Sequence, residues 1–176
     1  GAVIVAGQGR STVLEATSPS TGGGIDDVFR SNAPASTLRD LVVRAAGRID
    51  AGVRGFTTVS DVRVTGTAEA FSGITLINGA RGSRLVIDLV SSRPFFRGVL
   101  LYSSAVLEDA VVRIAGANAR GVTVSDVPSV VQPATVRHVT ILGDSAAGTR
   151  GADISVPVGS VLARVWRLYT YPRPRE

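Results

Sequence analysis

Hydrophobic and small polar residues alternate along much of this chain, and the alternation restarts at intervals of about twenty residues. One phrase is a glycine followed by a strict alternation, as in residues 121–125 (GVTVS). Segments of the same shape begin at Gly55, Gly73, Gly98 and Gly151. A period of two predicts β-strands, and self-similarity at this interval is typical of stacked repeat architectures.

A second phrase, LRDLVVR at residues 38–44, recurs as LEDAVVR at residues 107–113, with looser copies between and after them. The copies begin at Leu38, Val59, Gly82, Leu107 and Val136, in steps of 21, 23, 25 and 29 residues. Extending the series outward to residues 14 and 162 gives seven passes. We therefore predict an all-β protein, a single-stranded parallel β-helix (solenoid) of about seven coils.

A helix is the alternative for two of these copies, residues 38–47 and 107–116, where apolar residues also fit a helical spacing and a glycine follows. The other copies favour strands, because residues 62–65 (VRVT) and 139–141 (VTI) have β propensity and period two. Equivalent repeats stack on one another and are expected to fold alike.

Alternation also predicts which side chains face the interior, in columns that run from coil to coil. One coil alone has no core, so only stacking buries these columns. The predicted columns are Phe56, Ile74, Val99, Val122 and Ala152; Thr58, Leu76, Leu101, Val124 and Ile154; Leu41, Val62, Leu85, Ala110 and Val139; and Val43, Val64, Ile87, Val112 and Ile141.

The ends of the repeat are less regular. Residues 17–34 form a polar insertion in which Ile25, Val28 and Phe29 are expected to supply a strand. After residue 156 the pattern weakens, and Arg167 falls at an interior position unless a bulge shifts the register. We expect Trp166 to cover the open end of the rod. The chain begins at Gly1 and enters a strand at once, so we interpret it as a fragment of a longer protein.

Composition narrows the possible functions only moderately. The 176 residues fit one domain, and 44% hydrophobic content supports a large core. There is no cysteine, which excludes disulfides and thiolate metal sites. All 19 basic residues are arginine, and the net charge of +5 is compatible with acidic polymers as partners. No apolar run is long enough to cross a membrane, and we expect no nucleic-acid partner.

The repeat GVxV, a turn, then VxxVxI at 22–25 residues resembles that of the pectin-lyase-like superfamily. The opening residues 3–14 (VIVAGQGRSTVL) resemble the first coil of such proteins. The resemblance implies a right-handed parallel β-helix over residues 1–168, with 169–176 as a Pro/Arg-rich tail or linker. It further implies a secreted or cell-surface bacterial protein that acts on or binds polysaccharide, with calcium if it is a lyase.

Catalytic phrases typical of that superfamily are missing from this sequence. The polygalacturonase set is represented only by Asp26-Asp27, and the Trp-Ile-Asp-His and Asp-Pro-His-Asp phrases do not occur. Whether the chain is an enzyme therefore stays open. We expect a structural or carbohydrate-binding segment, with a uronate-polymer lyase or hydrolase as the alternative. The sequence assigns no metal site and no cofactor, and leaves the oligomeric state open.

Acidic residues recur at one position of the second phrase, at Asp40, Asp61 and Asp109, with His138 in the last clear copy. The alignment places Asp109 and His138 on adjacent coils, where they form a candidate catalytic acid/base pair. Stacked carboxylates would raise one another's pKa or recruit a cation. The alternative interpretation is a turn at which Asp bonds local backbone amides.

Arginines form the sharper pattern. Arg54, Arg97, Arg120 and Arg150 each precede a repeat glycine, and Ser72 alone interrupts the series. Guanidinium groups bind carboxylates and sulfates bidentately, so a column of them is a candidate site for an acidic polysaccharide. The alternative is solvated structural arginine in a chain without lysine. A second outward row is predicted at Arg44, Arg63, Asp88 and Arg113.

Overall fold

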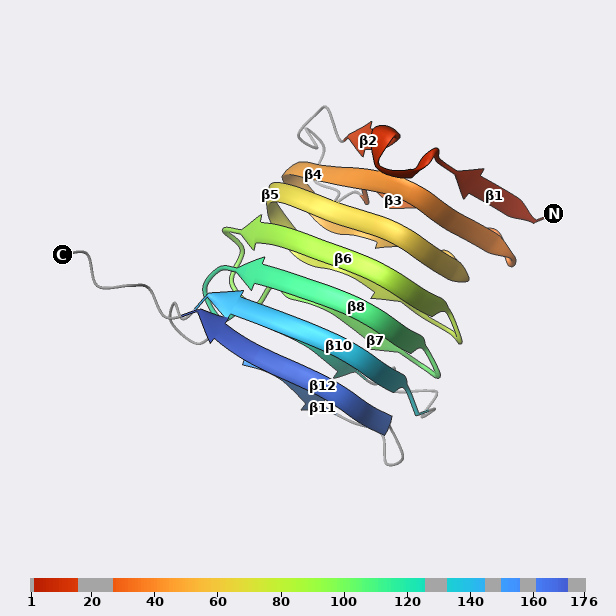
Figure 1. Ribbon diagram of the computed structural model, residues 1–176. Helices are drawn as coiled ribbons and strands as arrows, with labels where there is room; N and C mark the ends of the chain where they lie inside the picture. Colours follow the sequence, from red (N-terminus) through yellow and green to blue (C-terminus); the bar gives the residue numbers. More distant parts are fainter. Residues whose placement is uncertain (1, 16–26, 126–132, 145–149, 156–160, 171–176) are drawn as a thin grey trace.

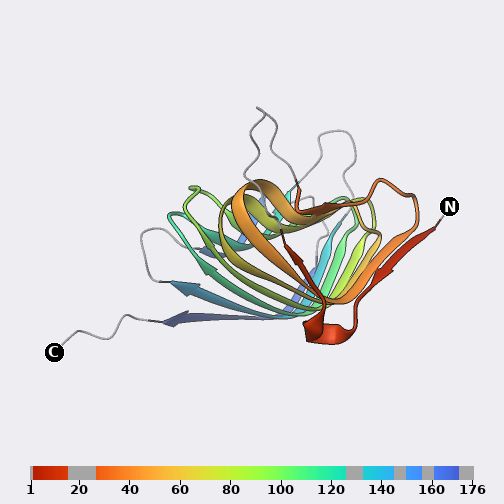
Figure 2. The ribbon, with the colours of Figure 1, turned by 90° about the horizontal axis from the view of Figure 1, so that it is seen from above.

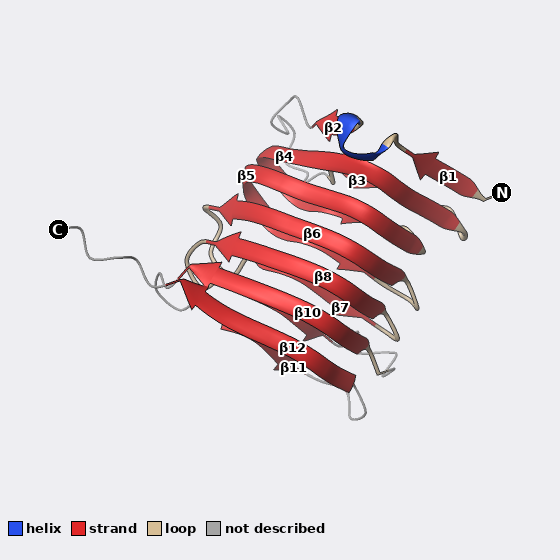
Figure 3. Cartoon of the chain, in the orientation of Figure 1, coloured by secondary structure: helices blue, strands red, loops and turns tan. Residues whose placement is uncertain are grey.

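The computed structural model describes residues 2–15, 27–125, 133–144, 150–155 and 161–170. Parallel strands stack along one axis to form a β-solenoid (Figure 1). The one helical segment among these residues is a short 3-10 turn, η1 (Gly9–Ser11), near the chain start (Figure 3). The predicted fold class is confirmed.

We divide each coil into three faces, which we call A, B and C. In the coil formed by the long strand β4 (Ser36–Arg54) they are residues 36–39, 41–49 and 51–54. Strand β5 (Thr58–Leu76) repeats this path. In later coils a break separates face C: β6 (Arg81–Ser91) precedes β7 (Arg97–Tyr102), β8 (Val106–Ala115) precedes β9 (Arg120–Ser125), and β10 (Thr135–Asp144) precedes β11 (Arg150–Ser155).

These strands form about five regular turns, fewer than the seven coils predicted. The difference lies at the two ends. The first coil consists of three short strands that each pair with β4: β1 (Val3–Ala6), β2 (Val13–Glu15) and β3 (Phe29–Arg30). At the other end β12 (Val161–Thr170) pairs, among the strands that the structure describes, only with β10. Seen from above, successive coils follow one another around a shared interior (Figure 2).

The predicted interior columns are confirmed over most of their length. Leu41 lies beside Val62, Leu85 beside Ala110 and Ala110 beside Val139. The neighbouring column of Val43, Val64, Ile87, Val112 and Ile141 is also in register, and these residues are fully buried or nearly so. Buried β-branched and leucine side chains in continuous columns are the main source of stability in such a fold.

Two members of the predicted columns were wrong. Val53, not Phe56, lies beside Ile74 on face C, and Thr58 lies beside Thr37 on face A. The cause is the choice of glycine: Gly52, not Gly55, is the neighbour of Gly73. Gly55 belongs to the turn after β4, where its φ of 80° and its close approach to the Ser31 carbonyl both favour glycine. Phe56 is still buried, and its ring stacks on the ring of Phe29 with the ring centres 5.3 Å apart.

Some of the remaining predictions are confirmed and others are wrong. Residues 38–47 and 107–116 contain strand, which confirms the strand interpretation over the helical alternative. Phe29 begins β3, whereas Ile25 lies outside the described residues. Trp166 is 67% exposed in an outward position beside Thr140, so it does not cover the end of the core. Arg167 pairs with Ile141 without a shift of register.

Two further points concern membranes and the tail. None of the described residues forms a helix with the length and apolarity that crossing a bilayer requires. Strand β12 continues to Thr170, and residues 171–176 of the predicted tail lie outside the described part of the chain.

Candidate functional site

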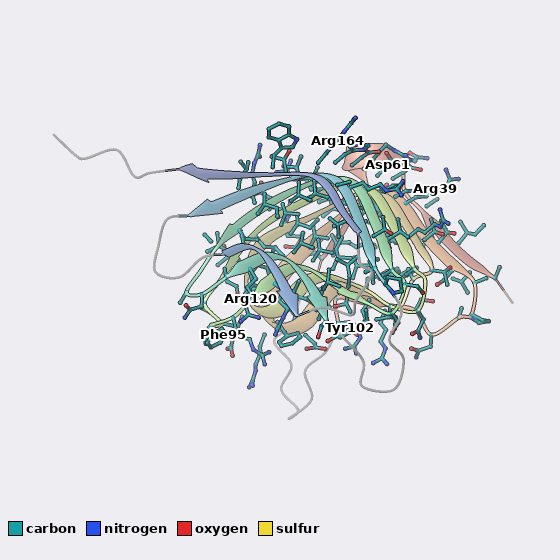
Figure 4. The ribbon with its side chains drawn as sticks, turned by 90° about the horizontal axis from the view of Figure 1, so that it is seen from below. Arg39, Asp61, Phe95, Tyr102, Arg120 and Arg164 are labelled. Atoms are coloured by element: carbon teal, nitrogen blue, oxygen red, sulfur yellow. The ribbon has the colours of Figure 1, made fainter. Side chains whose placement is uncertain are left out.

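Charged side chains gather on two surfaces of the solenoid. The first, the charged corner, is the bend between faces A and B, formed by Asp40, Asp61, Arg84, Asp109, His138 and Arg164. The second is the outer surface of face C, where the side chains of Arg97 and Arg120 from the predicted arginine column lie. Viewed along the stack, Arg39, Asp61 and Arg164 lie on the opposite side of the coil from Arg120 and Phe95 (Figure 4).

A single residue makes the bend at the charged corner in six successive coils. Its φ is 59° at Asp40, 54° at Asp61, 51° at Arg84, 52° at Asp109 and 51° at His138, and Arg164 repeats it at 54°. These values lie in the left-handed region, which Asp tolerates better than most side chains. The shared sequence position therefore reflects a shared backbone conformation, in line with the turn interpretation.

Neighbouring coils are linked at this corner by ion pairs. Nε and Nη2 of Arg84 donate to both carboxylate oxygens of Asp61, at 2.7 and 2.6 Å. This pairing lowers the pKa of Asp61 and raises that of Arg84. The predicted contact between adjacent coils is confirmed for Asp109 and His138, whose Oδ1 and Nδ1 are 3.2 Å apart. Both side chains are about half exposed.

Arg84 was missed as a member of this corner, although the sequence carried the signal. It lies two residues after Gly82, just as Asp61 lies two residues after Val59. Arg84 interrupts the predicted stack of carboxylates, so Asp40 and Asp61 are the only two corner carboxylates that lie on successive coils. Opposite charges on adjacent coils replace the repulsion that a continuous acidic column would have produced.

The carboxylates at this corner do not fit a calcium ion. Both oxygens of Asp61 accept hydrogen bonds from Arg84, and an oxygen of Asp40 accepts one from Arg39 at 3.2 Å. Calcium requires six to eight oxygen ligands. Among the residues that the structure describes, no three His, Asp or Glu side chains converge as a metal site would need.

The predicted arginine column is confirmed in register for three of its four members. Arg97 pairs with Arg120 and Arg120 with Arg150, on consecutive strands of face C. We call these three residues the arginine row. Ser72 precedes Arg97 in the same row, as predicted, but the next position is Ala51. Arg54 lies beside Thr75, three residues further along face C, because Gly55 is not equivalent to the other glycines.

Aromatic rings hold two members of the arginine row. The guanidinium carbon of Arg97 lies 4.3 Å from the ring centre of Phe71, and Arg93 approaches the same ring at 5.1 Å. Arg120 lies 5.8 Å from the ring of Phe95. These are cation–π distances. Phe95 is half exposed, whereas the following Phe96 is fully buried.

A cluster at the other end of face C was not predicted as a site. The register of β3 on β4 places Asp27 beside Ala51, in line with the arginine row. Burial raises the pKa of Asp27, Asp50 raises it further, and Arg54, Arg30 and the Ala51 backbone oppose the shift. The Asp27 side chain is only 3% exposed, and its Oδ1 has no hydrogen-bond partner. Nη1 of Arg54 donates to Asp50 at 2.6 Å.

The predicted outward row on face B needs one correction. Arg44, Asp88 and Arg113 share a row with Thr65, whereas Arg63 lies in the neighbouring row between Val42 and Val86. Arg63 nevertheless reaches across and donates to Asp88 at 2.8 Å.

The structure thus separates the predicted catalytic residues from the predicted binding residues. Asp109 and His138 belong to the charged corner. Asp61 of that corner lies across the coil from Arg120 of the arginine row (Figure 4). No protein-family model, curated protein or solved structure matches the chain. The fold and the two surfaces are therefore the basis for the functional argument.

Proposed function

We propose that this β-solenoid is a structural module that binds an acidic polysaccharide along the outer surface of face C. The observation that carries the proposal is the register of Arg97, Arg120 and Arg150 on three consecutive strands. Parallel strands lie about 4.8 Å apart, so the three backbone positions repeat at that interval along the rod. A row of guanidinium groups parallel to the axis matches an extended polymer that carries repeated carboxylates or sulfates.

The aromatic contacts support this role for the row. Phe71 and Phe95 lie within cation–π distance of the Arg97 and Arg120 guanidinium groups. Stacking reduces the number of side-chain conformations that a ligand would have to select, so it lowers the entropy lost on binding.

The wider assignment belongs to the same proposal. The parallel solenoid and its 21–29-residue repeat support membership of the pectin-lyase-like superfamily, in a secreted or cell-surface bacterial protein. The net charge of +5 favours association with an acidic polymer. No nucleic acid is proposed as a partner.

Affinity electrophoresis in gels containing polygalacturonate tests the proposal. The protein should be retarded, and added salt should weaken the retardation because the contact is between charges. Gels with a neutral polysaccharide should not retard it. Replacing Arg97, Arg120 and Arg150 together by Ser should abolish retardation, with circular dichroism verifying the fold.

A charge-matched control separates the row from general basicity. Arg44, Arg113 and Arg137 are exposed arginines on faces A and B. Replacing these three by Ser removes the same charge and should leave polymer retardation close to that of the unmodified protein. Equal loss in both triple variants would overturn the proposal, since binding would then depend on net charge alone.

The second candidate is a uronate-polymer lyase or hydrolase that uses Asp109 and His138. The 3.2 Å contact between their side chains supports an acid/base pair. A lyase would raise absorbance near 235 nm on a polyuronate, and a hydrolase would release reducing ends. Loss of either activity in His138→Gln, with the fold retained, would favour this candidate over a binding module.

A further inference from the structure

A cleft of about 360 Å³ lies beside the outer surface of face C, at the ends of β3, β4 and β5. Its walls are the segments that follow these strands in three successive coils, residues 30–34, 54–57 and 77–78. Arg30 and Arg54 line it and are in register with each other. The cleft is distinct from the arginine row, which begins two coils further along.

Short backbone contacts fix the walls of this cleft. The N–H of Ser31 donates to the carbonyl of Arg54 at 3.0 Å, and Thr57 exchanges hydrogen bonds with Ser36, the shortest 2.7 Å. A Cβ at Gly55 would meet the carbonyl of Ser31, so the two segments are in close contact. The guanidinium groups are therefore presented from a preorganised frame, which lowers the cost of binding.

Each of the two arginines is oriented by a neighbour. Nε of Arg30 donates to Oδ1 of Asn32 at 3.1 Å, and Nη1 of Arg54 donates to Oδ2 of Asp50 at 2.6 Å. Each contact occupies one of the five N–H donors of a guanidinium. The side chains are 57% and 36% exposed, so solvent and solutes reach them.

The charge of the cleft depends on Asp27, which does not line the cleft itself but has Oδ2 3.8 Å from Nε of Arg30. The charged groups facing it are Arg30 and Arg54, with Asp50 as the second carboxylate. With Asp27 ionised, two positive and two negative charges cancel. With Asp27 protonated, one positive charge remains, which matches a single carboxylate rather than a dianion.

We propose that this cleft binds one carboxylate group between Arg30 and Arg54, and that the buried Asp27 takes up a proton when the carboxylate binds. Asp27 is a positioning residue, because it acts on the ligand through the charge of the arginines. The carboxylate could come from a free organic acid or from an acidic sugar, and the cleft volume admits a monosaccharide. The inference does not depend on the arginine row.

The test is a titration followed by NMR of the arginine Nε–Hε groups, at constant ionic strength set with chloride. Acetate and galacturonate are the carboxylate probes, glucose is the neutral probe and sulfate is the dianion. Saturable shifts at Arg30 and Arg54 are expected with the two carboxylates and not with glucose. Tighter binding of galacturonate than of acetate would identify a sugar-borne carboxylate, and equal binding a free one.

The pH dependence of the dissociation constant separates proton uptake from simple charge attraction. Above the pKa of Asp27 in the free protein, affinity should fall by up to about tenfold per pH unit, the limit for uptake of one proton. Asp27→Asn should still bind acetate but lose this dependence. If Asp27 had only a structural role, the dissociation constant of Asp27→Asn would keep the same pH dependence, and that result would overturn the assigned role of Asp27.

Variants complete the test. Arg54→Gln and Arg30→Gln should each weaken carboxylate binding at least tenfold, and Arg30 is exposed enough that its replacement leaves the fold intact. Arg137→Gln removes an arginine that also has a carboxylate partner, Glu108 at 3.9 Å, and should have no effect. Unchanged binding in both cleft variants, or equal shifts at all surface arginines, would overturn the proposal.

Discussion

The solenoid bends at two corners with opposite side-chain requirements. The corner entering face C carries glycine in successive coils, at Gly52, Gly73, Gly98 and Gly121. A Cβ on Gly98 would contact Val112 and lie 2.6 Å from the carbonyl oxygen of Gly121. The charged corner instead carries Asp, Arg and His, with φ near +50° to +60°. One corner is limited by space and the other by backbone conformation.

This difference explains how chemistry is distributed over the molecule. Space excludes side chains at the glycine corner, so the functional groups there are the flanking residues, which are arginine in three successive coils. The charged corner has open space outside it, and its residues need only tolerate the left-handed conformation. Asp, Arg and His all occur there, so the corner is able to vary its charge without changing the fold.

The largest expected effect is the loss of the glycine corner. Gly98→Ala should lower the free energy of unfolding by about 3 kcal/mol, the upper range for overpacking a core. Asp109→Gly, at the other corner, should change it by less than about 1 kcal/mol, because glycine adopts positive φ readily. Urea denaturation of both variants measures the two values. Similar values would show that the corners are not limited in different ways.

A smaller effect is expected at the buried carboxylate of face C. The pKa of Asp27 is raised in the folded state above its ordinary value of 3.8, mainly by burial. The folded protein therefore holds this proton more tightly, and the free energy of unfolding falls as pH rises through the folded pKa. Asp27→Asn removes that fall and should stabilise the protein at neutral pH by on the order of 1 kcal/mol.

Thermal unfolding at several pH values checks this expectation. The advantage of Asp27→Asn should grow as pH rises through the folded pKa and disappear below about pH 3.8, where the carboxyl is protonated in both states. Asp50→Asn is the matched comparison, since Asp50 is a more exposed carboxylate whose partner is Arg54. An advantage of Asp27→Asn that does not vary with pH would contradict burial as the cause.

The sequence predicted the repeat, and with it most of the fold, because stacking requires equivalent residues at equivalent positions. The columns through Val43 and Leu41 followed from alternation alone. The prediction from the sequence failed at Gly55, because a glycine in a turn and a glycine at a corner look alike in sequence. That error moved Arg54 into the arginine row and placed Phe56 in a face C column.

The candidate sites were predictable only in part, for a related reason. The contact between Asp109 and His138 followed from the second phrase, because both residues occupy its third position. Asp27 could not be found this way, since β3 has two residues and no repeat to align. Its burial depends on how the short first coil lies on β4, a tertiary fact that no periodicity encodes.

Arg84 at the charged corner pairs with a carboxylate, whereas Arg97 and Arg120 on face C contact aromatic rings. A variant of Phe71 tests this difference. Replacing Phe71 by Leu removes the ring beneath Arg97 while keeping apolar volume, and should lower the free energy of unfolding by about 0.5–1 kcal/mol. The Nε–Hε signal of Arg97 should also move, because it loses the shielding of the ring. An unchanged signal would contradict the stacking. Leu replacing Phe95 gives the same test for Arg120.

The smallest effect concerns the ion pair at the charged corner. Arg84 lowers the pKa of Asp61 by donating two hydrogen bonds to it, so Arg84→Gln should return that pKa toward 3.8. Because the folded pKa is the lower one, Asp61 stabilises the protein above pH 3.8 and loses this contribution as pH falls through the folded value. Carbon-13 NMR of the carboxyl group follows the titration directly. High salt should raise the Asp61 pKa in the unmodified protein and leave Arg84→Gln nearly unchanged, since the pair is exposed and screened. A salt-independent pKa would instead show that the bidentate geometry, rather than the opposite charge, sets the acidity of this corner.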